Sequence, residues 1–356
     1  MAKKTTCAKV PKSHGERTII LANKLKIVDN SLEIQSDEKF VYIPLISHPS
    51  EATLKTITEQ VENLEVSSHV FPERKKRQTS VIELLGDKLS PHLLASLPRA
   101  IDFVGDIAII EIPPELDAYK NVIGEAILKA NRNVHTVLAK AGAVTGTYRL
   151  REFTVIAGEP KTETVHKEYG FQYQMDVAKA YFSPRLSYEH RRVASLVKEG
   201  ETVTDMFAGV GPFSIQIAKT HEKVKVYAID LNPHAIEYLR KNIRLNRVMG
   251  KVHPILGDAR KVVSERISGV ADRVIMNLPE KATDYVDVAC KAIKPTGGSI
   301  HFYSFINASD STENVKQSFT EAVEKIGRRV EKILLSRSVR ETAPYEFQVV
   351  LDARIH

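Results

Sequence analysis

The stretch Val203–Phe213 reads VTDMFAGVGPF, and it decides the fold. An apolar strand pattern, Val203–Met206, leads into a turn with two glycines, and the helix pattern Ser214–Lys219 follows. Gly209 and Gly211 let the backbone turn tightly and approach a ligand where a Cβ atom would clash. The turn carries only Gly-x-Gly and not the full dinucleotide fingerprint, so an ordinary strand–helix turn is the alternative interpretation of this stretch alone.

Strand and helix patterns alternate through residues 187–356, which predicts a mostly parallel sheet covered on both faces. Five apolar runs mark its strands: Thr202–Met206, Val224–Ile229, His253–Leu256, Arg273–Met276 and Ser299–Phe305. Two later runs with no helix between them, Ile333–Arg337 and Phe347–Ala353, predict an antiparallel hairpin on the same sheet. The predicted fold is therefore a Rossmann-like α/β domain with a seven-stranded sheet.

Acidic residues follow three successive strands of this predicted sheet. Asp205 stands just before the glycines, where it could orient an amino group of a ligand. Asp230 ends the next strand, about 20 residues on, where an acid hydrogen-bonds ribose hydroxyls. Asp258 follows the third strand, where it could accept from an adenine amino group. Each acid alone is more often a helix cap or loop residue, but together they favour a nucleotide-type cofactor at the carboxyl ends of the strands.

The fourth strand ends in Asn277-Leu278-Pro279. Amino-group methylases carry an Asn/Asp-Pro-Pro-aromatic motif at this point of the fold. Here the asparagine and the second proline are kept and Glu280 replaces the aromatic residue, so a plain strand-ending turn is the alternative.

The composition is that of a globular, weakly basic protein. The chain has 356 residues, of which 43% are hydrophobic, and 51 Lys and Arg stand against 44 Asp and Glu. The net charge of +7 fits a soluble surface and, as a weaker indication, a nucleic-acid partner. The two cysteines, Cys7 and Cys290, lie far apart and belong to no Cys/His cluster, so no metal site is expected. There is no signal peptide pattern and no apolar run near the ~20 residues of a membrane span, so we expect a cytoplasmic location.

The first half of the chain lacks the regular alternation and predicts two smaller α+β domains. Residues 1–68 combine one helix pattern with one strand pattern. Residues 69–78 hold four consecutive basic residues and predict a linker or arm. A solvated surface and contact with phosphates explain this basic run equally well. Residues 79–186 predict helices and two hairpins, with turns at Gly105-Asp106 and Tyr169-Gly170.

Several stretches together give the chain a resemblance to the archaeal and eukaryotic tRNA (guanine-37-N1)-methyltransferases. The most specific blocks are HGERT (14–18), FVGDIAII (103–110), YRLREFTVIAGE (148–159), VHKEYG (165–170), VAKAYFSPRL (177–186), DMFAGVGPFSI (205–215), AIDLNPHAIEYLRKNIRLN (228–246) and RVIMNLP (273–279). The resemblance implies a class I methyltransferase domain over residues 187–356 with S-adenosylmethionine as cofactor. It further implies a monomer that binds tRNA at the anticodon loop, with the N-terminal domain on the outer corner.

The implied reaction methylates N1 of guanosine 37. That nitrogen carries a proton, so a general base must remove it while the methyl sulfonium is attacked in line. A cation near O6 would stabilise the charge that develops there. The resemblance assigns these two roles to Glu189 and Arg149, and it assigns Asn277 to holding the target base and the cofactor. Without the family, Glu189 is only a carboxylate in a helix's first turn and Arg149 a residue of a solvated strand face.

The resemblance also completes the expected cofactor site. Arginine often follows the glutamate directly in this family, near the cofactor, but here the residue is His190. A backbone contact would survive this change, and Arg185 could supply the side-chain contact to the methionine carboxylate. The expected cofactor-binding set is Arg185, His190, Asp205, Phe207, Gly209, Gly211, Asp230, Leu231, Asp258, Ala259 and Asn277.

Two other functions remain open. The aminocarboxypropyl transferase of wybutosine synthesis shares the fold and the cofactor but transfers a different arm of it. Glu189 and the Asn277 turn favour methyl transfer, since an attacking ring nitrogen needs a base. A non-catalytic tRNA-binding relative is the second alternative, and the intact acids at the strand ends argue against it.

Overall fold

The computed structural model describes residues 2–73, 80–142, 146 and 148–356. The chain divides into two compact units, Met1–Thr79 and Ser80–His356. The predicted basic run at residues 74–77 lies outside the described residues.

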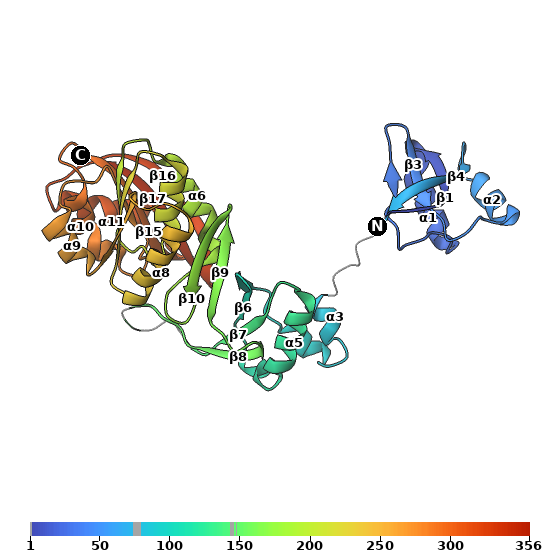
Figure 1. Cartoon of the computed structure of the whole chain (residues 1–356), viewed down its shortest axis with the longest axis horizontal. Helices are drawn as coiled ribbons and strands as arrows, with labels where there is room; N and C mark the ends of the chain where they lie inside the picture. The colour runs from blue at the N-terminus through green and yellow to red at the C-terminus, as the bar shows by residue number, and fades with distance from the viewer. Residues whose placement is uncertain (1, 74–79, 143–145, 147) are drawn as a thin grey trace. The chain divides into compact units, whose positions relative to one another are not determined.

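The first unit is built on a four-stranded antiparallel sheet in the order β2-β3-β1-β4 (Figure 1). Its elements are β1 (Ala2–Pro11), α1 (Gly15–Lys24), β2 (Gln35–Ser36), β3 (Phe40–Pro44), α2 (Glu51–Thr58) and β4 (Glu65–Pro72). The sequence patterns did not predict β1, because its first half is polar and exposed and only Cys7, Ala8 and Val10 are buried. Residues 69–72, expected in the linker, pair with the start of β1 and form the end of β4 instead.

The second unit begins with a four-stranded sheet in the order β5-β6-β7-β8. Its elements are α3 (Val81–Leu85), α4 (Pro91–Ala95), β5 (Ile101–Val104), β6 (Ile107–Ile110), α5 (Lys120–Ala130), β7 (Thr136–Lys140) and β8 (Phe153–Gly158). The hairpin expected at Gly105-Asp106 is confirmed, since β5 and β6 pair antiparallel across that turn. Helix α5 packs its buried face, which includes Ile123 and Ile127, against this sheet.

The second predicted hairpin is also confirmed, as β9 (Glu163–Glu168) and β10 (Phe171–Asp176) pair across Tyr169-Gly170. Two asparagines bind the backbone of β10: Asn242 in helix α8 (Pro233–Leu245) and Asn246, the residue after that helix. Asn242 accepts from the backbone N–H of Gln174 at 2.7 Å and donates back to its carbonyl at 3.0 Å. Asn246 makes the same pair of bonds to Gln172. The hairpin is thereby fixed to helix α8 and the residue that follows it, and the predicted boundary at residue 186 stays a prediction.

The seven-stranded sheet is confirmed, in the order β13-β12-β11-β14-β15-β17-β16. Its strands are β11 (Thr202–Asp205), β12 (Lys225–Asp230), β13 (Val252–Leu256), β14 (Arg273–Met276), β15 (Gly298–Asn307), β16 (Val330–Ala343) and β17 (Glu346–Ile355). The five strands β11 to β15 run parallel, and β17 of the late hairpin β16–β17 pairs antiparallel with β15. Strand β11 lies between β12 and β14, so the strand order reverses there, where open α/β sheets bind ligands.

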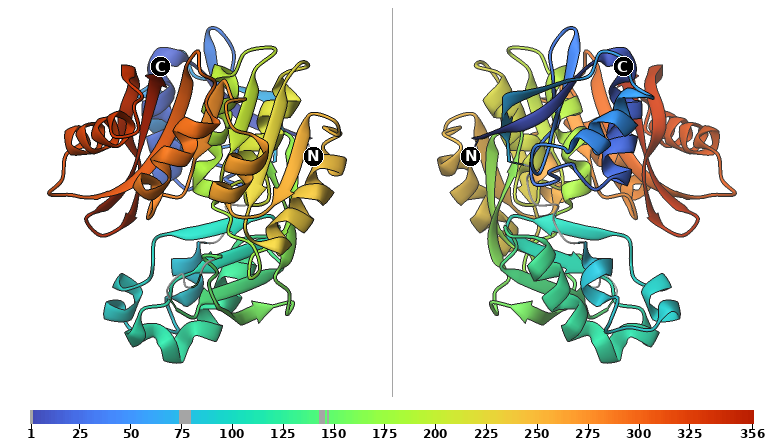
Figure 2. Two further views of the ribbon diagram at one scale, coloured as in Figure 1. Left: turned by 90° about the vertical axis from the view of Figure 1, so that its left-hand side faces the viewer. Right: turned by 90° about the vertical axis from the view of Figure 1, so that its right-hand side faces the viewer.

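Helices cover both faces of this sheet (Figures 1 and 2). One face carries α6 (Ser187–Leu196), α7 (Pro212–Thr220) and α8, and the other carries α9 (Ala259–Arg266), α10 (Val286–Ala292) and α11 (Thr312–Glu324). Strand β14 shows why both faces are apolar: Ile275 packs in the first layer, while Val274 and Met276 pack in the second. Within the described part of the chain, no helix is long and apolar enough to cross a membrane. The same residues contain no group of three or more His, Cys, Asp or Glu side chains that could hold a metal ion.

Candidate active site

A cavity of about 210 Å³ opens at the carboxyl ends of the parallel strands. The predicted site residues among its lining are Arg149, His190, Phe207, Gly209, Asp230, Leu231, Asp258, Ala259 and Asn277. Four other predicted site residues do not line it: Arg185, Glu189, Asp205 and Gly211. Nine of the predicted site residues thus lie around one cavity, and the other four lie outside its lining.

Asp230 connects the end of β12 to the glycine turn. Its Oδ2 accepts from the Gly209 N–H at 2.7 Å, and its Oδ1 accepts from the Asn232 N–H at 2.8 Å. Burial raises the pKa of this carboxyl, while the backbone N–H groups oppose the shift. Each carboxylate oxygen has two lone pairs, so both retain one that could accept from a ribose hydroxyl.

The two glycines of the turn are required for different reasons. Both have left-handed backbones, with φ of +55° at Gly209 and +93° at Gly211. A Cβ atom on Gly211 would lie 2.3 Å from Leu239 Cδ1 on α8. Gly209 lines the cavity, whereas Gly211 permits the turn and the close packing of α7 against α8.

Asp205 lies behind the turn and is fully buried. Its Oδ2 accepts from the Ser214 hydroxyl at 2.7 Å, and its Oδ1 has no hydrogen-bond partner among the described residues. Burial, with a smaller contribution from the charge of Asp230, raises the pKa of Asp205 to about 7. In this structure the residue ties β11 to the first turn of α7.

The walls of the cavity are apolar on both sides. Phe207 meets Tyr285 edge to face, with ring centroids 5.1 Å apart. Leu231 is 41% exposed, and that exposed surface includes the cavity wall. Asp258 caps helix α9 by accepting from the Arg260 N–H at 2.8 Å and also lines the cavity, so the helix-cap and ligand interpretations are compatible. Such walls could hold a flat heteroaromatic ring with a polar group at its edge.

A second cavity of about 430 Å³ shares Arg149, Tyr181 and Arg340 with the first. Its lining also includes the basic residues Lys140, Arg151 and Arg185 and the acidic residues Asp102, Glu280 and Glu346. Arg185 is engaged there, since its Nε donates to Asp102 at 2.5 Å. The structure thus places Arg185 in the second cavity and not beside the glycine turn.

Arg149 stands where the two cavities meet. Its Nη2 donates to Glu280 Oε1 at 2.9 Å, and its guanidinium lies 5.5 Å from the Tyr181 ring centroid. Its φ of +56° is unusual for a residue with a Cβ atom, and its Nε is buried with no partner among the described residues. A strained backbone and a free donor at a cavity wall are typical of a ligand-binding residue.

His190 lines the first cavity. Its Nδ1 lies 2.8 Å from Glu168 Oε2, and the ring meets Phe213 edge to face at 4.6 Å between centroids. Both His190 and Glu168 are buried. The histidine is therefore held in one orientation by a buried carboxylate.

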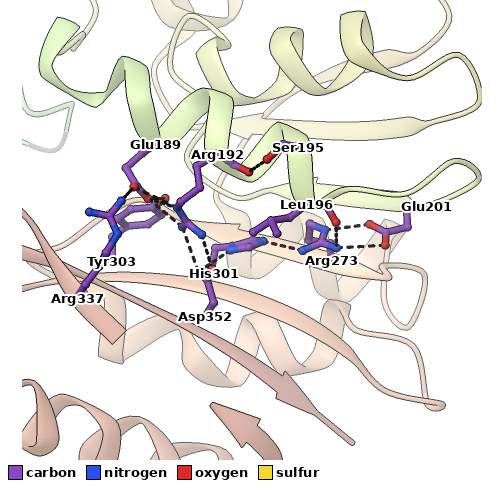
Figure 3. Close-up of polar contacts among 10 residues, drawn as sticks. All are labelled: Glu189, Arg192, Ser195, Leu196, Glu201, Arg273, His301, Tyr303, Arg337 and Asp352. Atoms are coloured by element: carbon purple, nitrogen blue, oxygen red, sulfur yellow. Dashed lines mark hydrogen bonds and ion pairs between the residues drawn. The ribbon is translucent and has the colours of Figure 1, made fainter. Parts of the chain in front are cut away.

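Glu189 lies in a buried polar network on the other side of α6 (Figure 3). Its carboxylate accepts from Arg192 on both oxygens, from the Tyr303 hydroxyl at 2.8 Å and from Arg337. Arg192 continues the network by donating to Asp352 at 2.5 Å. Two guanidinium groups, those of Arg192 and Arg337, thus lie against this carboxylate.

The network extends from Asp352 through His301 and Arg273 to Glu201, just before β11 (Figure 3). His301 lies 2.6 Å from Asp352 through Nδ1 and 2.8 Å from the Arg273 guanidinium through Nε2. A guanidinium only donates, so Nε2 must accept and the proton of His301 sits on Nδ1. Burial lowers the pKa of His301, which agrees with a neutral ring. Arg273 ends the network on Glu201 at 2.9 Å.

The cavity lining includes polar residues that the sequence did not single out as site residues, among them Tyr181, Glu280, Arg340 and Gln348. Tyr181 lies inside the quoted block VAKAYFSPRL and could have been singled out as an aromatic beside a predicted site. Glu280 was noted only as a departure from a motif, and the structure makes it the partner of Arg149. Arg340 and Gln348 come from the late hairpin, where no local pattern signals a site.

Family models match most of the chain. The TRM5/TYW2 methyltransferase domain matches residues 164–333, the TYW2 N-terminal domain matches residues 81–162, and the tRNA methyltransferase 5 N-terminal domain matches residues 7–53.

Relatives support the same family. The chain is 40% identical to the tRNA (guanine(37)-N(1))-methyltransferase Trm5b of Pyrococcus abyssi, over 99% of both chains. It is 33% identical to the tRNA(Phe) (4-demethylwyosine(37)-C(7)) aminocarboxypropyltransferase of Pyrococcus horikoshii, over 77% of this chain and 95% of that protein.

Two solved structures are similar along nearly the whole chain. A complex of aTrm5 with tRNALeu has a TM-score of 0.73 and 35% identity, covering 98% of this chain and 99% of that one. Trm5 of Methanocaldococcus jannaschii in complex with adenosine has a TM-score of 0.64 and 33% identity, covering 98% of both chains.

Proposed function

The chain belongs to the TRM5/TYW2 methyltransferase family, and from that premise we propose that it transfers the methyl group of S-adenosylmethionine to N1 of guanosine 37 in tRNA. The observation that carries this proposal is the end-to-end similarity to a relative named for that reaction, including the N-terminal unit. The cavity geometry supports this proposal. The first cavity, lined by Asp230 and Asp258, could hold the cofactor, and it adjoins the second cavity, which is lined by several arginines.

The cofactor is proposed to lie along the glycine turn. Asp230 would accept from the ribose hydroxyls, Leu231 and Phe207 would flank the adenine, and Asp258 would accept from its amino group. When bound, S-adenosylmethionine supplies the electrophilic methyl group. His190, held by Glu168, is proposed to face the methionine end of the same cavity.

The target base is proposed to enter from the second cavity. Arg149 lines both cavities and presents a donor that could stabilise charge developing on guanine O6. Tyr181 lies beside it and offers a ring face on which a base could stack. The basic residues of the second cavity suit the phosphates that flank an extruded nucleotide.

Glu189 is proposed as the general base that accepts the N1 proton. Its neighbour on α6, His190, lines the cavity, so the carboxylate is close to it in sequence but lies behind the wall. To accept a proton, Glu189 must release one of its donors. Arg337 is the most exposed of the three, with 33% of its side chain accessible, and is therefore the donor that substrate entry displaces at least cost.

Replacing Asp230 with alanine is expected to weaken S-adenosylmethionine binding by about 10- to 100-fold, because the hydrogen bonds that the ribose hydroxyls would donate to this carboxyl are lost. Titration calorimetry measures this directly. Glu237→Ala, which removes an exposed carboxylate from α8, is the matched control and should bind as the wild type does. An unchanged affinity in Asp230→Ala would place the ribose elsewhere.

The N-terminal domain, residues 1–68, is proposed to contact the outer corner of the tRNA. The aminocarboxypropyl transferase remains the alternative reaction, since such a relative covers 77% of this chain. The match to the tRNA methyltransferase 5 N-terminal domain favours methyl transfer.

The proposal is tested with methyl-labelled cofactor and two tRNA transcripts that differ only at position 37. Guanosine 37 should accept the label, and adenosine 37 should not, because adenine presents an amino group where guanine presents O6. Equal labelling of both transcripts would exclude guanosine 37 as the target.

A further inference from the structure

The side-chain amide of Asn277 is held by hydrogen bonds from the last two strands of the sheet. Arg340 of β16 donates from Nε to Gln348 Oε1 at 2.9 Å. Gln348 of β17 then donates from Nε2 to Asn277 Oδ1 at 3.3 Å. Gln348 is 1% exposed, so water does not compete for its amide.

These two hydrogen bonds, from Arg340 to Gln348 and from Gln348 to Asn277, are called the relay below. The chemistry of arginine determines which group donates and which accepts in each of them. A guanidinium has only N–H donors, so Gln348 must turn its oxygen toward Arg340 and its amino group toward Asn277. Asn277 must then turn its own oxygen toward Gln348. Reversing either amide would set N–H against N–H in a buried place, which costs the full desolvation of an unpaired donor.

Arg340 is itself anchored at three points. Besides Gln348, its Nη1 donates to the Ser183 hydroxyl at 2.8 Å and its Nη2 donates to the Tyr181 hydroxyl at 3.3 Å. Ser183 and Tyr181 both line the first cavity. The guanidinium that sets the relay is thus attached to the wall where the target base is proposed to enter.

The relay leaves the amino group of Asn277 for the cavity. No hydrogen bond from Asn277 Nδ2 is found within the described ranges, and the residue lines the first cavity. A ligand there meets a donor from Asn277 and a second donor from Arg149.

We propose that Arg340 and Gln348 are positioning residues that make Asn277 a donor toward the cavity, and that this donor selects a target base with a carbonyl oxygen over one with an amino group. The inference rests on the proposed function for the identity of that base. Guanine O6 would accept from Asn277 and Arg149, whereas the adenine N6 amino group would meet two donors.

Gln348→Glu is the variant that reverses the relay. A carboxylate keeps the size of the glutamine and its bond to Arg340, but it accepts only, so Asn277 must turn its amino group to residue 348 and its oxygen to the cavity. Gln348→Met is the matched control, because it removes both bonds without imposing either orientation on Asn277.

The amide orientation is measured without substrate. Asparagine-selective ¹⁵N labelling gives side-chain amino signals, and Asn277→Asp identifies the one from Asn277 by its loss. In the full-length wild type this amino group faces the cavity and exchanges with water; Gln348→Glu should slow the exchange by about 10-fold, because the amino group becomes bonded to a buried carboxylate. Equal exchange rates in the two proteins would overturn the relay.

Base selection is measured by binding of tRNA transcripts in the presence of S-adenosylhomocysteine. The probes carry guanosine 37 or 2-aminopurine 37, which lacks O6. The wild type should prefer guanosine by about 10-fold, and Gln348→Glu should reduce this preference to within about two-fold, with Gln348→Met between them. A wild-type preference retained in Gln348→Glu would overturn the selection. If the exchange and binding results hold but the wild type transfers no methyl group to guanosine 37, the proposed function fails and the relay stands.

Discussion

Replacing Glu189 with glutamine is expected to slow methyl transfer by about 10²- to 10⁴-fold, which is the usual contribution of a general base. Guanine N1 must lose its proton to attack, and a glutamine amide cannot take it. S-adenosylmethionine affinity should stay within about two-fold, because Glu189 does not line the cavity. Single-turnover rates with saturating cofactor and tRNA measure the loss separately from binding.

Two further variants separate the loss of the base from damage to its network. In Glu189→Gln the new amino group lies against the N–H donors of Arg192 and Arg337, which disturbs the network. Glu189→Asp avoids this, because it keeps a carboxyl group but moves it away from the substrate by one methylene. This second variant should also transfer methyl groups slowly. Glu201→Gln perturbs the far end of the same network at Arg273 and should keep activity within about three-fold (Figure 3). A wild-type rate in both Glu189 variants would remove Glu189 from the role of base.

The stability of the second unit is expected to fall as the pH rises from about 4 to about 7 because of Asp205. Burial raises the pKa of Asp205 from 3.8 to about 7 in the folded protein. Below pH 4 the carboxyl is protonated in both folded and unfolded chains, so burying it does not lower the free energy of unfolding. Between pH 4 and pH 7 the carboxyl ionises in the unfolded chain but stays protonated in the folded one, which lowers the free energy of unfolding. Above pH 7 this loss of stability is complete. A shift of about three pH units corresponds to a cost on the order of 4 kcal/mol.

Asp205→Asn removes this cost, because the amide stays neutral and its oxygen still accepts from Ser214. The variant should match the wild type near pH 4 and be more stable above pH 7. Amide hydrogen exchange of peptides that span β11 reports this unit separately from the first, and comparison at equal pH cancels the intrinsic exchange rate. Asp310→Asn, on the exposed surface, is the control. A stability difference that does not change with pH would show that Asp205 has an ordinary titration.

The seven-stranded sheet could be predicted because its signals are local. Each parallel strand is a short apolar run, and each is followed by a turn that carries an acid or a glycine. Strands end at the turn with Gly209, at the acids Asp230 and Asp258, and at Asn277. The position of the cavity at the carboxyl ends of the parallel strands could therefore be predicted from the strand positions alone.

The remaining site residues could not be predicted because they depend on packing between distant segments. Successive residues of a helix point about 100° apart, so His190 faces the cavity while Glu189 faces β15 and the buried network, and no sequence pattern distinguishes the two. Arg340 and Gln348 reach Asn277 only because β17 pairs between β15 and β16. Arg185 was expected at the cofactor, but its ion pair with Asp102 comes from a strand 83 residues earlier in the chain.

Methyl transfer to N1 of guanosine 37 is tested by identifying the nucleoside that carries the transferred group. The protein is incubated with a tRNA transcript and S-adenosylmethionine labelled separately in its methyl and carboxyl groups, and the modified nucleoside is identified and mapped by mass spectrometry. The account predicts methyl label alone, recovered as 1-methylguanosine from position 37. Carboxyl label in the tRNA, or a methyl group on another nucleoside, would contradict it.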